Sequence, residues 1–305
     1  MRKWYRPGMK SSGAHRNKGK IVPRPRTFRA QPAYNSYMRT ILAAALLIVV
    51  LASGGPASAQ TPNVNDNGVV DAASFRQPVA PGSIVSIFGT NFASGLATAS
   101  TVPLSTSLGG TSVTFNGLPA PLFFVGPLQI NAQLPSGLTG NSANIVVTNA
   151  AGSSVPKAVA ISPTAPGIFS VNQAGTGQGW VLFANSAVVA APAGSLGPTI
   201  ESRPAKPGDI LTIYANGLGP VSPPVADGNN TLDGLRRTTN DPTILIGGVT
   251  VPSQNVLFSG LAPQFVALYQ INFTLPSGVP SGDSVPVQIS IGGATSTDKL
   301  TMAIQ

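Results

Sequence analysis

The chain of 305 residues has no cysteine and a single histidine, His15. Without cysteine there can be no disulfide framework, no thiolate nucleophile and no cysteine-ligated metal. His15 lies upstream of a segment that we expect to be removed, so the mature chain would also lack imidazole. Ser-His-Asp triads, Cys-His dyads and imidazole-ligated zinc are therefore excluded from the mature protein.

Charge is scarce and unevenly placed. Only 9% of the residues are charged, and the formal net charge is +9. Eleven of the 18 basic residues lie in residues 1–39, and no acidic residue precedes Asp66. Residues 60–305 hold seven basic and nine acidic side chains, a net charge of −2. Because nucleic-acid binding needs a basic surface, we expect no nucleic-acid partner.

A secretory signal explains the basic start. Residues 41–52 form an almost unbroken apolar run, which is followed by Ala57-Ser58-Ala59. A run of about 12 residues is shorter than the ~20 needed to cross a bilayer, so we predict cleavage after Ala59, with Ala57 and Ala59 as the small residues of the site. An uncleaved N-terminal anchor is the alternative. Translation would begin at Met38, unless residues 1–37 are a genuine basic extension. The expected location is outside the cell, at its surface or in the periplasm, with no membrane span after cleavage.

The mature chain repeats itself. Pro81–Asn91 (PGSIVSIFGTN) returns as Pro207–Gly217 (PGDILTIYANG), and Gln129-Ile130-Asn131 returns as Gln270-Ile271-Asn272. The offset grows from 126 to 141 residues, so the second copy has longer loops. The additional residues fall mainly in 221–239, which is rich in Pro, Gly, Asn and Asp, where surface insertion costs little.

Alternating apolar and polar residues predict short strands. Such alternation occurs at 83–88, 112–115, 287–291 and 300–304. Asn116-Gly117 and Gly247-Gly248 predict hairpin turns at equivalent points of the two copies. Short strands with abundant Gly and Pro are typical of antiparallel sandwiches. We therefore predict an all-β protein with a first sandwich at 60–163, a packed β-rich connector at 164–203 that fixes the sandwiches relative to each other, and a second sandwich at 204–305.

Several of these motifs resemble a known family. Gly82–Phe92 (GSIVSIFGTNF), Thr111–Ala120 and Ile145–Asn149 resemble an IPT/TIG domain, which implies an immunoglobulin-like fold. A fuller pattern resembles an uncharacterised domain common at the C-terminus of secreted acidobacterial proteins. It comprises VVDAASF at Val69–Phe75, APGIF at Ala165–Phe169, Pro204–Val221 and LYQINFTLP at Leu268–Pro276. Neither resemblance implies a catalytic residue.

One loop carries oxygen-bearing side chains at the spacing of a calcium loop. Asp227, Asn229, Thr231 and Asp233 stand at positions 1, 3, 5 and 7, but position 12 is not Glu and position 6 is not Gly. The pattern is therefore not an EF-hand. An irregular calcium site using Asp227, Asn229 and Asp233 is one hypothesis, and a metal-free binding loop that also uses Asn230 is the other.

Other chemistries find little support. Trp180 is the sole tryptophan after the signal, and it either stacks on a sugar or, beside Val181, belongs to the core. Glu201 and Asp209 would form a glycosidase pair only if they shared a cleft. We therefore predict a secreted, non-enzymatic tandem that binds an extracellular protein or glycan through loop 221–239 or a sheet edge. One alternative is a carbohydrate-binding module, which would have Trp180, Tyr214 or Tyr269 exposed in a row on one sheet face. The other is a glycan-active enzyme with paired carboxylates.

Overall fold

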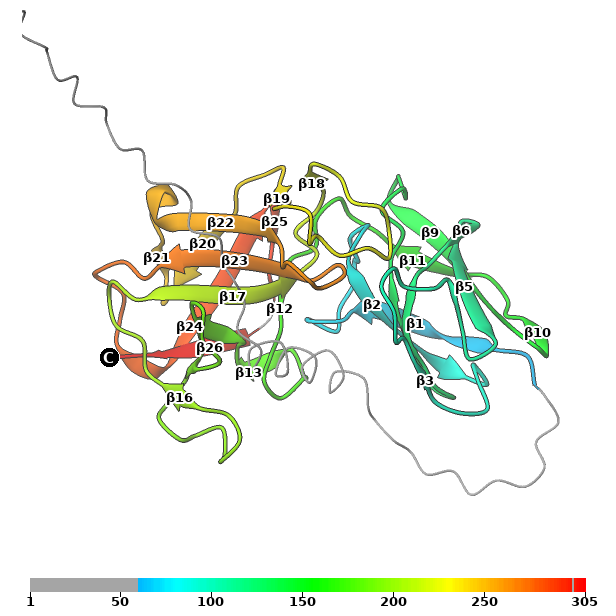
Figure 1. The fold of residues 1–305 in the computed structure, drawn as a ribbon, viewed down its shortest axis with the longest axis horizontal. Coiled ribbons are helices and arrows are strands. Elements are labelled where there is room, and N and C mark those ends of the chain that lie inside the picture. Colours follow the sequence, from blue (N-terminus) through cyan, green and yellow to red (C-terminus); the bar gives the residue numbers. More distant parts are fainter. Residues whose placement is uncertain (1–59, 298) are drawn as a thin grey trace, which may run out of the picture.

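The computed structural model describes residues 60–297 and 299–305 (Figure 1). The predicted signal segment, with Ala57 and Ala59, and residues 1–37 lie outside the described residues. Regular structure within them is β-strand except for one turn of 3-10 helix, η1 (Ser253–Asn255). None of the helical structure described is long and apolar enough to span a membrane. The predicted all-β class is confirmed.

The first module is a sandwich of two sheets. The first sheet has the order β1 (Asn63–Asp71), β2 (Ile84–Thr90), β8 (Gln129–Gln133), β7 (Leu122–Val125) and β3 (Ala97–Thr98). The second has the order β10 (Gly152–Ser153), β9 (Ser142–Asn149), β5 (Thr111–Phe115) and β4 (Ser107–Leu108), with β11 (Lys157–Ala160) beside β9 and β6 (Leu118–Pro119) beside β5. All of these strand pairs are antiparallel, as an immunoglobulin-like sandwich requires.

The second module has the same two-layer plan with more strands. Its larger sheet has the order β16 (Ser202–Arg203), β15 (Val189–Ala190), β14 (Val181–Phe183), β17 (Ile210–Asn216), β23 (Tyr269–Thr274), β22 (Val256–Leu261), β19 (Arg237–Thr238) and β18 (Val221–Ser222), with β12 (Gly167–Ile168) beside β17. The facing sheet has the order β13 (Thr176–Gln178), β26 (Lys299–Ile304), β24 (Gly282–Ile291), β20 (Thr243–Ile246) and β21 (Val249–Thr250), with β25 (Ala294–Thr295) beside β24.

The predicted strands and hairpins form because side-chain alternation matches the pleat. In β5, Thr111, Val113 and Phe115 are buried, while the residues between them are partly exposed. Asn116 and Gly117 make the β5–β6 turn with φ of 48° and 80°. Gly247 and Gly248 do the same between β20 and β21 with φ of 58° and 84°. Both hairpin predictions are confirmed, since Asn and Gly reach positive φ at low cost.

Each sandwich has its own apolar core. The core of the first module includes Val85, Ile87, Phe115 and Ile130, all fully buried. The corresponding core of the second module includes Leu211, Ile213 and Phe273. The strand that opens each repeat, β2 or β17, therefore supplies two alternate residues to its own core, which explains the similarity of the two sequences at this point.

The segment predicted as a β-rich connector, 164–203, contains the short strands β12 to β16, which pair within the sheets of the second module. Strands β12 and β14 pair with β17, and β13 pairs in parallel with β26. A third apolar cluster joins the modules: Phe169, Trp180 and Tyr214 pack with Ala72 and Ile84 of the first module. The two sandwiches lie side by side (Figure 1), and both contribute residues to this cluster.

Candidate functional site

A buried group of hydrogen bonds between Asn216, Asp71 and the Ile84 backbone, here called the polar lock, connects the two modules. The Asn216 side chain, at the end of β17, is fully buried and donates to the Asp71 Oδ2 atom at 2.5 Å. It also pairs with the backbone of Ile84, donating to the carbonyl at 2.7 Å and accepting from the N–H at 3.0 Å. The amide thus imitates a neighbouring strand, because it offers one donor and one acceptor side by side.

Asp71 is held from its own module as well. Its Oδ1 atom accepts from the backbone N–H of Ala73 at 3.0 Å and of Ser74 at 2.8 Å. Asp71 and Asn216 are 145 residues apart in the chain and had no place among the predicted site residues. Buried polar groups are stable only when they are hydrogen-bonded, so this lock favours one relative arrangement of the modules.

Glycines allow the backbones to approach each other beside the lock. Gly217 has φ of +67°, and a Cβ atom there would lie 2.1 Å from the carbonyl oxygen of Ala165. A Cβ on Gly167 would lie 2.7 Å from the Asp71 carboxylate. A side chain at Gly167 would displace the Asp71 carboxylate, and one at Gly217 would push the backbone next to Asn216 away from Ala165.

The long insertion of the second module reaches the first module. The Gly228 carbonyl accepts from the N–H of Leu104 at 2.9 Å, and the Gly228 N–H donates to the Gln133 Oε1 atom at 2.6 Å. The Asp227 carboxylate accepts from the Gln133 side-chain amide at 3.3 Å and from the Ser136 N–H at 3.0 Å. The loop that we expected to bind a partner is thus anchored on the neighbouring module.

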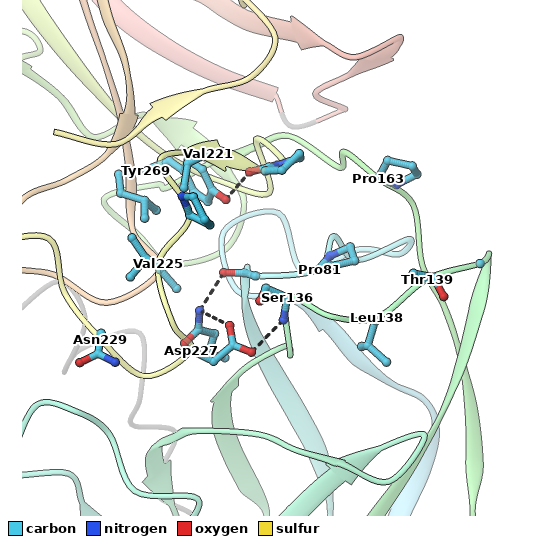
Figure 2. Close-up of a pocket in the computed structure, with 18 residues that line it drawn as sticks. Pro81, Ser136, Leu138, Thr139, Pro163, Val221, Val225, Asp227, Asn229 and Tyr269 are labelled. Atoms are coloured by element: carbon cyan, nitrogen blue, oxygen red, sulfur yellow. Dashed lines mark hydrogen bonds between the residues drawn. The ribbon is translucent and has the colours of Figure 1, made fainter.

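A cleft opens between the insertion and the first module (Figure 2). Its volume is about 500 Å³, within the range of ligand pockets. Both modules supply its walls: Pro81, Gly82, Gln133, Ser136, Leu138, Thr139 and Gly140 from the first, Pro163 from the junction, and Gly219, Pro220, Val221, Pro224, Val225, Asp227, Asn229, Leu261, Ala267 and Tyr269 from the second.

The lining is mostly apolar. Tyr269 donates its hydroxyl to the Gly219 carbonyl at 2.5 Å, and burial raises the pKa of this phenol above its usual value. The phenol is therefore neutral at physiological pH. Asp227 is the one carboxylate in the lining, and no Lys or Arg belongs to it. The cleft thus offers an apolar surface with a single negative group.

The structure divides the predicted loop residues between two environments. Asp227 and Asn229 line the cleft, whereas Asn230 is half-buried outside the lining. Asp233 is exposed and accepts from Arg236 at 2.6 Å, and this hydrogen bond lowers the pKa of the Asp233 carboxyl. Among the described residues no three acidic side chains gather as a metal cluster. An irregular calcium site that uses Asp227, Asn229 and Asp233 stays a prediction.

The aromatic candidates are all buried. Trp180 is 6% exposed, Tyr269 is 3% exposed and Tyr214 has no exposed surface. Trp180 lies in the apolar cluster between the modules, where its ring faces contact protein. A row of exposed rings was the feature that would indicate a carbohydrate-binding module, and these three residues do not form one.

Carboxylates do not converge in the cleft. Asp209 accepts from the Lys206 N–H at 2.9 Å and lies 3.7 Å from Arg203, while Glu201 is exposed. Neither belongs to the cleft lining. Glycoside hydrolysis uses two carboxyl groups about 5 to 10 Å apart, and the cleft holds one.

The wall contributed by the first module was missed in the sequence. Gln133, Ser136 and Leu138 belong to it, and Ser136 falls in the LPSG motif that occurs once in each copy. That motif indicates a turn in both copies. The longer loops of the second copy were the one feature of the sequence to indicate that a loop could cover one of these turns.

Residues 69–162 match the family model of the IPT/TIG domain. The matched segment coincides with the first module, and the second module shares its two-layer plan. The two modules are therefore immunoglobulin-like sandwiches. No curated protein sequence matches the chain. The resemblance to an acidobacterial C-terminal domain stays a prediction.

Several solved structures are similar at low identity. The surface glycan-binding protein PbSGBP-B from Prevotella bryantii is 16% identical over 82% of this chain and 42% of that chain, with a TM-score of 0.25. A Bacteroides ovatus SGBP-B, solved with a mixed-linkage heptasaccharide, is 15% identical over 82% and 46%, with a TM-score of 0.32. Domains 5–6 of the S-layer protein SbsC are 11% identical over 80% and 99%, with a TM-score of 0.26. The chain spans less than half of either glycan-binding protein, and likeness at this level carries no information about a ligand.

Proposed function

We propose that this chain is a secreted, non-enzymatic binding protein that holds an extracellular protein or glycan in the cleft between its two modules. The observation that carries the proposal is that the insertion at 221–239 makes a cleft of about 500 Å³ together with the first module. Neither module could form this cleft alone. Sites at the junction of domains are common locations for ligands, because two walls bury more of the ligand than one surface does.

The expected location outside the cell follows from the signal-like segment that ends at Ala59. A role without catalysis is supported by the lining, which holds a single carboxylate and no histidine, cysteine or lysine. The absence of cysteine agrees with a protein whose stability depends on packing, and the apolar clusters of the structure provide that packing.

An array of extracellular proteins and glycans, probed with the purified protein in the presence and absence of calcium, tests the proposal. Thr139→Trp would fill the cleft from its exposed rim, whereas Ser281→Trp adds the same ring at an exposed position outside the lining. We expect the first variant to lose binding to whatever the array identifies, and the second to retain it. Equal binding by both variants would place the ligand elsewhere on the protein.

A further inference from the structure

The charge of the cleft restricts what can occupy it. Asp227 is the one carboxylate of the lining, the Tyr269 phenol is neutral, and no basic side chain belongs to the lining. Asp227 forms no ion pair within the part of the chain that the structure describes. An anionic ligand would meet only a like charge there, so neutral and cationic ligands remain.

Asp227 still has room for a ligand. Each of its two oxygens accepts one hydrogen bond from the first module, at 3.3 Å from Gln133 and at 3.0 Å from Ser136. A carboxylate offers about four acceptor positions, so roughly two stay unused by these contacts. The same contacts fix the orientation of the carboxylate, which reduces the cost of ordering it when a ligand binds.

The apolar side chains that line the cleft favour a ligand with an aliphatic chain. Leu138, Val225 and Pro81 line the same cleft as Asp227, and Figure 2 shows Val225 and Leu138 on opposite sides of Asp227. The aromatic residue of the lining, Tyr269, is only 3% exposed, so the cleft offers little ring surface for flat stacking. Long side chains that end in a cation place apolar methylene groups against such walls and keep the charge at the polar end.

We propose that the cleft recognises an aliphatic organic cation, with an ammonium or guanidinium group on the Asp227 carboxylate and its methylene stem against the apolar walls. This inference rests on the proposed function of the cleft and adds the chemistry of its ligand. A lysine or arginine side chain of a partner protein and a free alkylamine share this chemistry. Hydrogen bonds to a charged carboxylate are stronger than neutral ones, so Asp227 would carry much of the discrimination.

The test uses three tripeptides that differ at one side chain and one free alkylamine. The tripeptide acetyl-Ala-Lys-Ala-amide and free butylammonium carry the cation, whereas the Nε-acetylated tripeptide and its Glu counterpart do not. Binding is measured by chemical-shift titration of the purified full chain. We expect both cations to bind, the neutral and acidic peptides to bind at least about tenfold more weakly, and added salt to weaken the cations alone. Binding of the lysine peptide without butylammonium would identify a side chain of a partner as the source, and binding of both would show that a free amine suffices.

Variants separate this inference from the proposed function. Asp227→Asn keeps an oxygen for the Ser136 N–H, but it removes both the charge and the oxygen that accepts from Gln133. It should weaken binding of the lysine peptide at least about tenfold, while Asp241→Asn, at an exposed carboxylate outside the lining, should not. Equal binding of the acetylated and free lysine peptides, or no effect of Asp227→Asn, overturns the cation inference. Should Thr139→Trp still abolish capture of the array ligand in that case, the cleft remains the binding site. Should Thr139→Trp leave that capture intact, the proposed function itself fails.

Discussion

Removal of the Asn216 side chain should lower the free energy of unfolding, because this side chain connects the two modules. Asn216→Ala deletes three hydrogen bonds at a fully buried position, one of them to the Asp71 carboxylate. A hydrogen bond to a charged group contributes about 1.5 to 3 kcal/mol, and leaving a buried N–H such as that of Ile84 without a partner costs about 1 to 3 kcal/mol. The Ile84 carbonyl keeps its bond from the Ala72 N–H at 3.1 Å. We therefore expect a loss of about 3 to 5 kcal/mol in the free energy of unfolding.

Urea unfolding monitored by tryptophan fluorescence measures this loss. In a Trp4→Phe background Trp180 is the only tryptophan, and it lies in the apolar cluster between the modules. The midpoint should fall by roughly 1 to 2 M urea. Thr90 occupies the position equivalent to Asn216 in the first copy and is exposed, so Thr90→Ala is the matched control, with an expected change within about 0.5 kcal/mol. A difference of less than about 1 kcal/mol between the two variants would refute the idea that the lock holds the modules together.

Three further perturbations test other parts of the structure. Gly217→Ala should destabilise the protein by more than Gly248→Ala, since both glycines have positive φ but only Gly217 has a carbonyl oxygen in the path of a new Cβ; equal melting temperatures in calorimetry would contradict this. Trp180→Ala should cost about 3 to 5 kcal/mol in urea unfolding followed by circular dichroism, because it opens a cavity in the cluster between the modules, and a loss below about 1 kcal/mol would mean that the site is not packed as described. Burial raises the pKa of the Tyr269 phenol. The stability that the neutral phenol contributes is therefore present below the unfolded pKa of about 10 and decreases as the pH rises above that value. In urea titrations buffered at about pH 9 and 11, Tyr269→Phe should lose less stability between the two pH values than the parent does.

The strands and turns could be predicted from the sequence because the residue patterns that indicate them are local. Alternation in 112–115 and 300–304 and the turn pairs Asn116-Gly117 and Gly247-Gly248 depend on neighbouring residues, and each appears where it was expected. The duplication extended these signals from one module to the next, since a strand recognised in one copy supports its counterpart in the other.

The cleft was only partly accessible, because it depends on contacts between distant residues. Asp227 and Asn229 were singled out from loop composition, and both line the cleft. Nothing near Gln133 or Ser136 indicates that a loop about 94 and 91 residues away would cover them. The Asp71–Asn216 pair shows the same limit, since a buried Asp and a buried Asn have no periodic pattern and look like turn residues in the sequence.

The pairing of the connector strands decides where this protein could be divided by recombination. Because β12, β13 and β14 complete the sheets of the second module, an exchange at residue 203 would leave these strands attached to the wrong partner. An exchange before residue 164 would keep both sandwiches complete but would expose Ala72 and Ile84 on the first module. A new neighbour for the first module would therefore have to supply both an apolar face and an amide in the position of Asn216, so the duplicated modules have become partners that can no longer be shuffled independently.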